Sequence, residues 1–285
     1  MDVARTPADM SALADDARRA GRRIALVPTM GALHAGHASL LDEGRRRSDV
    51  LVLSIFVNPL QFGPNEDLSR YPSTPESDLA QAQQSGVDIL YLPTPGAMYP
   101  PGYQTTITVS GLEEGMCGAQ RPGHFRGVAT VVCKLFTACK PHLALFGNKD
   151  YQQLQIIRCM ARDLDLGVDV VGMPIVREPD GLAMSSRNVY LSSEERARSL
   201  AVSRALRAVE RAFEAGERDG VALLSHARAE LFEGIASADL TLEYLDLRDT
   251  TSLVELQRVE QSAVVAIAVR VGKTRLIDNT ILTVT

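Results

Sequence analysis

Two histidines three residues apart are the first side chains in this sequence whose spacing suggests chemistry. His34 and His37 lie in the string PTMGALHAGH, residues 28–37, shortly after the apolar run 24–27. If a helix begins near residues 34–36, this spacing places both imidazoles on one face of the helix. A helix N-terminus offers unpaired N–H groups to an anion, and an imidazole can donate a proton or a hydrogen bond near neutral pH. The pair therefore indicates a site for an anionic ligand.

Two other interpretations of the histidine pair remain open from the residues alone. They can be ordinary polar residues at a helix cap. They can also be two ligands of a zinc ion, but zinc requires at least a third protein ligand, and no cysteine or acidic cluster lies nearby in the sequence.

Two later segments also combine residues that suit a phosphorylated ligand. Lys149 and Asp150 follow the apolar run 143–146, where a lysine can neutralise a polyphosphate and an aspartate can accept from a sugar hydroxyl. The string GLAMSSRNVY, residues 181–190, places two hydroxyl groups before an arginine, and a guanidinium binds phosphate oxygens through a fixed fork. A solvated Lys–Asp pair and a polar loop before a helix are the ordinary alternatives.

The elements that must position these residues alternate between strands and helices. Short apolar or β-branched runs predict strands at residues 24–27, 50–57, 87–92, 143–146 and 168–176. Helical patterns lie between most of them, at residues 36–47, 74–85, 126–139 and 150–163. This alternation predicts an α/β fold with a parallel sheet covered on both faces, so that the three segments follow strands at one edge of the sheet.

The last third of the chain has a different pattern. Residues 192–232 are helical in pattern with a capped start at Ser192, and strands are expected at 242–247, 263–271 and 275–278. Pro179 and Gly181 interrupt the pattern between the two parts. We therefore expect two domains, 1–176 and 177–285, the second a small α+β unit.

Composition excludes several classes of protein. The chain has 285 residues, of which 45% are hydrophobic, and a formal net charge of −5, so no general field attracts nucleic acid or an anionic membrane. No apolar stretch approaches the roughly 20 residues that span a bilayer. The four cysteines form no CxxC pair, and the N-terminus resembles a charged helix more than a signal peptide. These features favour a reducing, cytoplasmic setting.

Five strings in a fixed order extend the interpretation from single sites to a family. The HxGH signature of residues 34–37 resembles the nucleotidylyl-transferring superfamily, and the whole series is similar to successive signatures of the pantoate-β-alanine ligase family: VPTMGALHAGH, SIFVNPLQFGPNEDLSRYPST, RPGHFRGVATVV, FGNKDYQQLQIIR and DGLAMSSRNVYLS. A weaker closing string, residues 274–279, extends the resemblance almost to the C-terminus. Asn148 departs from the acidic residue expected there, while Lys149 and Asp150 keep the pattern.

The resemblance implies a fold and a reaction. The fold is a Rossmann-like parallel sheet domain with the HxGH motif, followed by a smaller α+β domain that acts as a lid. In the reaction, the carboxylate of pantoate attacks the α-phosphorus of ATP to give pantoyl adenylate and pyrophosphate, and the amine of β-alanine then displaces AMP. The resemblance further implies Mg²⁺ with the ATP, small-molecule substrates, no nucleic acid or membrane partner, and a homodimer formed through the nucleotide-binding domain.

The resemblance also assigns residues to ATP. It implies that six residues make catalytic contacts with the phosphates: His34, His37, Lys149, Ser185, Ser186 and Arg187. Among them, His37 is the proton donor. The wider ATP-binding set comes from the same segments: Met30, Gly31, Ala32, Leu33, Ala35, Gly36, Gly147, Asn148, Asp150, Val176 and Met184. Within that set, Gly147 and Asp150 contact the adenosine and Val176 lies beneath the adenine.

For pantoate the resemblance implies two neutral amides. Gln61 and Gln153 each offer a donor and an acceptor, which suits a hydroxy acid and leaves the nucleophilic carboxylate unquenched. Asn58 is expected to fix the turn that carries Gln61, and Arg121 and His124 are lesser candidates.

The metal ligands are left open by the sequence. Asp78 is a candidate near magnesium, and the alternative for it is a surface position on a helix. Cys117 is expected in a loop, with a structural or incidental role and not as a nucleophile.

Three other functions compete with the ligase interpretation. Another adenylyl- or cytidylyl-transferring enzyme would share the phosphate features but leaves Gln61 and Gln153 unexplained. A tRNA-charging enzyme requires a basic face for its nucleic acid, against which the acidic balance argues. A non-catalytic nucleotide sensor would keep the binding residues and lose turnover.

Overall fold

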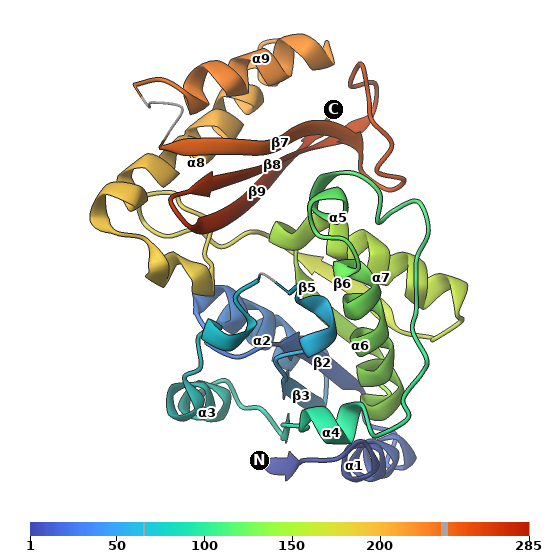
Figure 1. Cartoon of the computed structure of the whole chain (residues 1–285). Coiled ribbons are helices and arrows are strands. Elements are labelled where there is room, and N and C mark those ends of the chain that lie inside the picture. The colour runs from blue at the N-terminus through green and yellow to red at the C-terminus, as the bar shows by residue number, and fades with distance from the viewer. Residues whose placement is uncertain (65, 235–238, 285) are drawn as a thin grey trace. The chain divides into compact units, whose positions relative to one another are not determined.

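The computed structural model describes residues 1–285 with the exception of 65, 235–238 and 285 (Figure 1). The described residues form two compact units. The N-terminal unit comprises Met1–Glu113, Arg121–Asn148 and Gln153–Pro174, and the C-terminal unit comprises Glu114–Gln120, Lys149–Gln152 and Ile175–Thr285. The long segment of the C-terminal unit thus begins at Ile175, and two short earlier segments belong to the same unit.

A six-stranded parallel sheet forms the centre of the N-terminal unit. Its strands pair in the order β1-β4-β3-β2-β5-β6. Their bounds are β1 (Asp2–Ala4), β2 (Ile24–Thr29), β3 (Val50–Ile55), β4 (Ile89–Tyr91), β5 (Leu143–Gly147) and β6 (Asp169–Met173). The five strands expected from apolar runs are all present, and the α/β class with a parallel sheet is confirmed. β1 was not predicted, because three residues are too short to show a periodic pattern.

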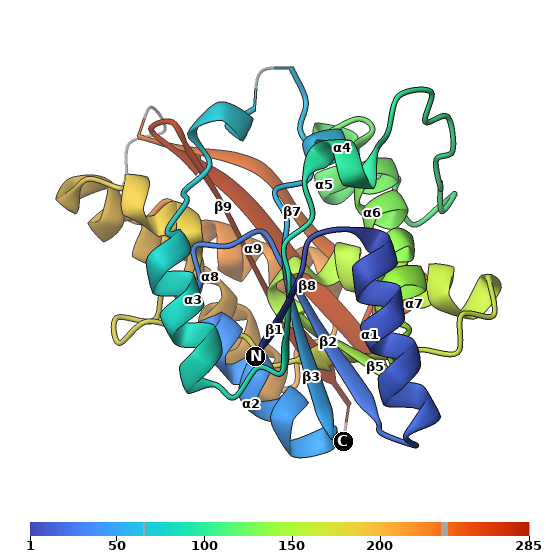
Figure 2. The same ribbon diagram turned by 90° about the horizontal axis from the view of Figure 1, so that it is seen from below.

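Helices cover both faces of this sheet. The helices and turns between the strands are α1 (Pro7–Arg19), α2 (Ala35–Arg47), η1 (Pro59–Gln61), η2 (Leu68–Arg70), α3 (Pro75–Gln84), α4 (Pro95–Met98), α6 (His124–Cys139), η3 (Asn148–Asp150) and α7 (Tyr151–Asp163). α1 and α6 contact each other and β2, whereas α2 contacts β2, β3 and β5. Figure 2 shows α1 and α6 on one side of the strands and α2 and α3 on the other. Since β2 is covered on both faces, residues 24–27 are all fully buried, which explains their continuous apolar run.

The strand order reverses direction at β2. The chain passes from β2 to β3 on one side of the sheet and later enters β5 on the other side of β2. In open α/β sheets, ligands bind at the carboxyl ends of the strands at such a reversal. The loop after β2, which carries His34, and the turn after β5, which begins at Asn148, both start there.

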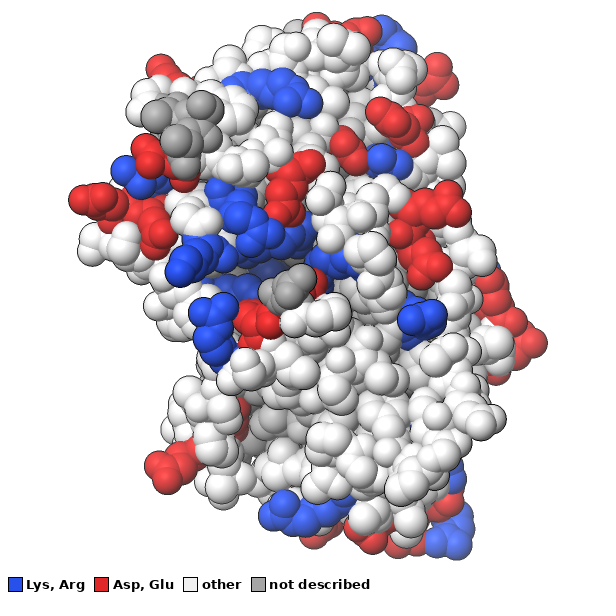
Figure 3. All heavy atoms as spheres, viewed as in Figure 1, with Lys and Arg blue, Asp and Glu red and all other residues white. Residues whose placement is uncertain are grey.

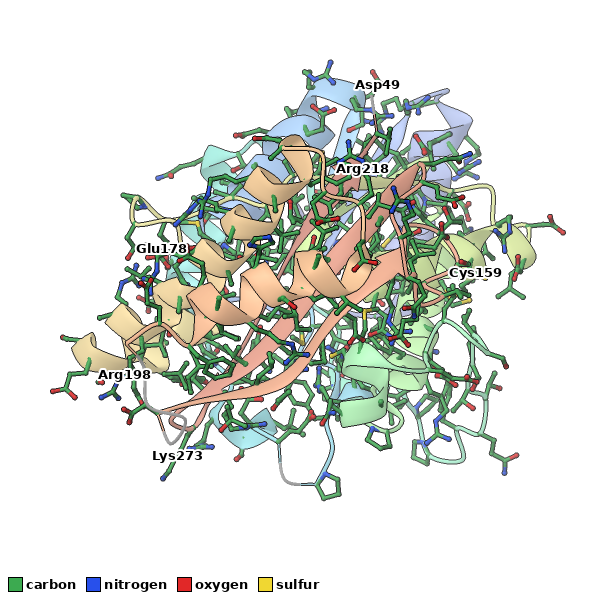
Figure 4. All side chains as sticks on the ribbon, turned by 90° about the horizontal axis from the view of Figure 1, so that it is seen from above. Asp49, Cys159, Glu178, Arg198, Arg218 and Lys273 are labelled. Atoms are coloured by element: carbon green, nitrogen blue, oxygen red, sulfur yellow. The ribbon has the colours of Figure 1, made fainter. Side chains whose placement is uncertain are left out.

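The C-terminal unit contains a three-stranded antiparallel sheet in the order β7-β8-β9, with bounds Leu240–Asp249, Ser262–Val271 and Thr274–Thr283. Its helices and turn are α5 (Met116–Gln120), η4 (Ser186–Tyr190), α8 (Ser193–Glu214) and α9 (Gly220–Leu231). α8 and α9 pack side by side on the sheet, as Figure 4 shows, and bury Leu206, Val209 and Ile267 in a common core.

The predicted capped start of α8 is confirmed. The hydroxyl of Ser192 accepts from Glu195 N at 3.2 Å, and the Glu195 carboxylate accepts from Ser192 N at 2.9 Å. The expected helical stretch 192–232 is divided into α8 and α9 at Gly216, whose φ of +103° ends the first helix.

Charged side chains of both signs lie next to one another on the part of the surface that the C-terminal unit forms in Figure 3. Ion pairs account for part of this mixture, for example Arg196 with Glu178 and Asp180, both at 2.6 Å. Among the described residues, no helix is both long enough and apolar enough to cross a bilayer.

Candidate active site

The loop between β2 and α2 brings the backbone into a left-handed conformation before the histidines. Gly31 has φ +83° and Ala32 has φ +50°. A β-carbon at Gly31 would lie 3.0 Å from Asp78 Oδ2 and 3.1 Å from Ile55 Cγ2. Glycine is therefore required at this position for both its conformation and its close packing.

Asp78 holds this loop from α3. Its side chain is 3% exposed, Oδ2 accepts from Ala32 N and Oδ1 from Leu33 N, both at 2.9 Å, and Oδ1 also accepts from Thr74 Oγ1 at 2.9 Å. The alternative of a surface helix residue is therefore wrong. Both carboxylate oxygens accept from the loop that precedes His34, so Asp78 has a structural role in this loop.

Replacing Asp78 with alanine is expected to lower the free energy of unfolding by about 3 kcal/mol, because two backbone N–H groups lose a buried acceptor. Urea unfolding followed by circular dichroism measures this change. Glu76→Ala is the matched control, since Glu76 is an exposed acidic residue in the same first turn of α3. A Glu76→Ala loss as large as that of Asp78→Ala would contradict the loop-holding role.

The two histidines stack at the N-terminus of α2. His34 is the N-cap residue, and its ring centroid lies 4.1 Å from that of His37 at an interplanar angle of 36°. The Nδ1 atom of His34 accepts from Gly36 N at 3.1 Å, and Nδ1 of His37 accepts from His34 N at 3.3 Å. Both rings lie on one face of the helix, as the spacing of three predicts.

These hydrogen bonds assign the tautomer of each neutral ring. An Nδ1 atom that accepts carries no proton, so the proton of each imidazole is on Nε2. Both histidines thus cap the N-terminus of α2, as polar residues commonly do, and the cap also aligns their two Nε2–H groups. The described residues contain no group of three or more His, Cys, Asp or Glu side chains that could hold a metal ion.

Gln61 ends the short turn η1, and Asn58 fixes that turn as expected. Asn58 is 1% exposed, and its Nδ2 donates to Gln61 Oε1 at 3.0 Å and to Gly127 O at 3.1 Å. The side-chain Nε2 atom of Gln61 lies 3.1 Å from the Sδ atom of Met30. The structure therefore brings the Gln61 side chain to the loop that leads to the histidines.

A charged network of Arg121, Glu66 and His124, the first residue of α6, holds the same turn. Arg121 donates to both oxygens of Glu66 at 2.7 Å and to Gln61 O at 3.2 Å, and its Nη1 lies 2.9 Å from His124 Nε2. His124 Nδ1 lies 2.8 Å from Gln61 O. Burial opposes ionisation of Glu66, but the Arg121 guanidinium keeps the pKa of that carboxyl below its usual value. Arg121 and His124 thus contact the backbone of Gln61, and Glu66 completes the network.

The other sites predicted in the N-terminal unit follow β5. Gly147 is the last residue of β5, with open space where a β-carbon would be, and Asn148 begins η3. Gln153 is half-buried on α7. Open space at Gly147 allows a ligand to approach the backbone closely.

The remaining predicted residues belong to the C-terminal unit. Lys149 Nζ lies 3.6 Å from Asp150 Oδ2, and the Lys149 side chain is 20% exposed. Met184 N donates to Val176 O at 3.0 Å, so these two residues close a hairpin. The hydroxyl of Ser185 accepts from Arg187 N at 3.2 Å and caps η4, which contains Ser186 and Arg187. All three residues of this 185–187 segment are half-buried.

Cys117 differs from expectation. It lies on α5, where it is 7% exposed, and its N–H donates to Gln152 Oε1 at 3.0 Å. The expected loop position is therefore wrong, because residues Met116–Gln120 form a short helix.

Residues that the sequence did not single out contribute to both units. Glu66 binds Arg121, which contacts the Gln61 turn, and Gly127 O accepts from Asn58 in that turn. Asp278 and Asn279 contact the segments of Val176 and Lys149, respectively. All four lie inside strings that carry the family resemblance, so position within a motif was the available signal.

Comparisons with known proteins agree over nearly the whole chain. The family model for pantoate-beta-alanine ligase matches residues 2–281. A pantothenate synthetase of Trichlorobacter lovleyi is 55% identical over 265 residues, which cover 93% of this chain and 93% of that protein.

Two solved structures are similar in fold as well as in sequence. Pantothenate synthetase from Thermus thermophilus aligns with a TM-score of 0.92 and 42% identity over 98% of this chain and 99% of that one. The pantoate-beta-alanine ligase of Francisella tularensis, complexed with beta-gamma ATP and beta-alanine, aligns with a TM-score of 0.80 and 32% identity over 98% and 97% of the two chains. The similarity therefore includes the sequences of both units.

Proposed function

The chain belongs to the pantoate-beta-alanine ligase family, and from this membership we infer that it is an enzyme that condenses pantoate with β-alanine at the expense of ATP. The family match over residues 2–281 is the observation that carries the assignment. The structure of the Francisella tularensis relative is a complex with beta-gamma ATP and beta-alanine, which supports ATP and β-alanine as substrates of this chain.

We propose that the reaction proceeds in two steps. A carboxylate oxygen of pantoate attacks the α-phosphorus of ATP, the bond to the bridging oxygen breaks, and pyrophosphate leaves. The β-alanine amine then attacks the acyl carbon of pantoyl adenylate, loses a proton and expels AMP. Positioning and stabilisation of the developing negative charge supply the catalysis, so no covalent protein nucleophile is required.

We propose that the stacked histidines contact the triphosphate. Their Nε2–H groups are aligned by the α2 cap, and the helix N-terminus adds a partial positive charge. His34 and the backbone of Met30–Gly36 also contact the triphosphate. Among these groups, His37 is the proton donor as charge accumulates on the leaving phosphate. This assignment is supported by the common orientation of the rings at the strand-order reversal.

We propose that pantoate binds beside Gln61 and Gln153. The Gln61 amide is held next to Met30 by Asn58, so a neutral donor and acceptor lie beside an apolar side chain. This combination suits a hydroxy acid with a methylated carbon, since the amide orients the carboxylate without neutralising it.

We propose that the C-terminal unit supplies cations and a lid. Lys149, Ser185, Ser186 and Arg187 hold the phosphates, Asp150 and Gly147 the adenosine, and Val176, Met184 and Asn148 complete the nucleotide contacts. As a lid, the unit would exclude water from the reactive anhydride. The half-buried hydroxyls and guanidinium of η4 suit phosphate oxygens, as the fixed fork of arginine does in general.

Magnesium enters this proposal as part of the substrate MgATP. The described residues hold no acidic cluster that would form a protein cage, and both oxygens of Asp78 accept from backbone groups. Magnesium is commonly bound through substrate phosphates with few protein ligands. No step is therefore assigned to a protein-bound metal.

We also propose a homodimer formed through the N-terminal unit, in the cytoplasm. β6 is the last strand of the six-stranded sheet, and an edge strand presents backbone groups to which a second copy can add. The four cysteines are free thiols, as a reducing compartment maintains them.

An assay of both products tests the proposed reaction. Pyrophosphate release is expected to require ATP and pantoate together, and AMP release is expected to require β-alanine in addition. Pyrophosphate release that is independent of pantoate would contradict the ligase assignment, and binding of ATP without any turnover would instead identify a sensor.

A further inference from the structure

We infer that the last strand of the chain, β9, positions both phosphate-binding segments of the C-terminal unit through Asp278 and Asn279. The inference rests on the proposed roles of Lys149 and of residues 185–187 with the triphosphate. Asp278 and Asn279 act through these residues and have no contact with ATP in this proposal, so they are positioning residues.

Asn279 fixes the backbone from which the Lys149 side chain begins. Asn279 is 4% exposed on β9, and its Nδ2 donates to Lys149 O at 2.9 Å. Lys149 lies in η3, a single turn between β5 and α7. Because lysine has a flexible four-carbon stem, the position of its charge depends strongly on where its backbone is held.

Asp278 binds the other segment through Arg177. Asp278 is 3% exposed, and its two oxygens accept from the two terminal nitrogens of Arg177 at 2.6 and 3.1 Å. The Oδ1 atom also accepts from Asn279 N at 2.9 Å. The paired arrangement of two parallel contacts is the geometry in which a guanidinium and a carboxylate restrain each other most.

Arg177 carries this restraint to the segment that precedes Ser185. Its Nη1 also donates to Gly181 O at 3.2 Å, and its backbone pairs with Ala183 in an antiparallel bridge. The hairpin closes at Met184 and leads directly into η4, which itself contacts β9. The tip of the hairpin has an independent anchor at Glu178, labelled in Figure 4, which accepts from Asn188 Nδ2 at 2.6 Å and pairs with Arg196.

The alternation of a β-strand explains how neighbouring residues reach two segments. Successive side chains of a strand point to opposite faces, so Asp278 and Asn279 can bind separate partners from one short stretch. β9 is an edge strand of the three-stranded sheet, paired along its whole length with β8. The strand is thus held rigidly by the sheet while it restrains Lys149 and the hairpin relative to each other.

Two variants of the full-length enzyme test the inference. Asn279→Ala removes the donor to Lys149 O, and Asp278→Asn removes the charge that orients Arg177. Each is expected to slow pyrophosphate release from ATP and pantoate by about tenfold or more, because misplaced binding groups lose positioning. Amide formation from separately prepared pantoyl adenylate and β-alanine, which needs no pyrophosphate contacts, is expected to keep the parent rate.

A neighbouring variant controls for loss of stability. Thr280 is the next residue of β9, and its Oγ1 donates to Glu210 Oε1 on α8. Thr280→Val removes this hydrogen bond and leaves the contacts of Asp278 and Asn279 in place. It is expected to keep the parent rates of both half-reactions. Equal slowing of both half-reactions in Asn279→Ala, or a parent rate of pyrophosphate release in that variant, would overturn the inference.

A double variant separates this inference from the proposed function. If Asn279 acts through Lys149, then Lys149→Ala with Asn279→Ala is no slower than Lys149→Ala alone, whereas multiplied losses would overturn the inference. A parent rate for Lys149→Ala contradicts the proposed role of Lys149 itself. A slow Lys149→Ala beside a fast Asn279→Ala contradicts the positioning role alone.

Discussion

Substituting His37 with alanine is expected to slow pyrophosphate release from ATP and pantoate by about 10²- to 10⁴-fold, the range that a positioned proton donor contributes. The physical reason is the cap geometry of α2. His34 N donates to His37 Nδ1 at 3.3 Å, so the ring proton lies on Nε2. Rapid-quench measurement of pyrophosphate in single turnovers isolates this step.

The loss of stability in His37→Ala should be small by comparison. The ring accepts one hydrogen bond at a helix start, and loss of such a cap contact costs about 1 kcal/mol. Ser39→Ala is the matched control on α2, since it removes the Ser39 Oγ to Gly36 O hydrogen bond of 2.8 Å and leaves both rings in place. The proton-donor role fails if His37→Ala releases pyrophosphate at nearly the rate of Ser39→Ala.

The sequence was sufficient for features that depend on neighbours along the chain. The run 24–27 predicts β2 because every residue in it is apolar, and the structure buries all four. The spacing of His34 and His37 predicts their common face because one helical turn brings such residues together. Both predictions depend on local geometry, because the spacing of residues along the chain determines which side chains share a face of a helix or are buried in a strand.

Features that depend on distant partners were not accessible in the same way. The sequence leaves Asp78 as a candidate metal ligand or a surface residue, yet its partners are backbone N–H groups 46 and 45 residues away. Every residue except proline carries such a backbone donor, so no pattern of residue types marks the contact. The link between Asn279 and Lys149 O, 130 residues apart, was missed for the same reason.

Tautomers and close approaches form a third class. The sequence shows that two imidazoles are present, but only the hydrogen bonds to Gly36 N and His34 N assign the proton to Nε2. Likewise, glycine in the middle of a helix is unfavourable by its propensity, and only the position of a neighbouring turn explains Gly127 in α6. Such roles require coordinates because they concern where atoms meet.

Replacing Gly127 with alanine is expected to displace the Gln61 turn. A β-carbon at Gly127 would overlap the carbonyl group of Leu60 and would lie 2.7 Å from Gln61 N. Backbone atoms cannot rotate away as a side chain can, so η1 must move by roughly 1 Å, a displacement that can cost about 10²-fold in rate. We expect this loss in kcat/KM for pantoate, with a destabilisation of about 1–3 kcal/mol from overpacking.

The direction of the Gly127→Ala effect is opposite to what helix propensity alone gives, which is a gain of about 1 kcal/mol for alanine in a helix interior. Gly63→Ala, two residues beyond Gln61, is the control. A β-carbon at Gly63 meets only the Glu66 side chain, at 3.7 Å or more. Steady-state kinetics with varied pantoate, together with thermal unfolding, compares the two variants. Parent values of kcat/KM and stability in Gly127→Ala would show that α6 does not hold the side-chain amide of Gln61 in place.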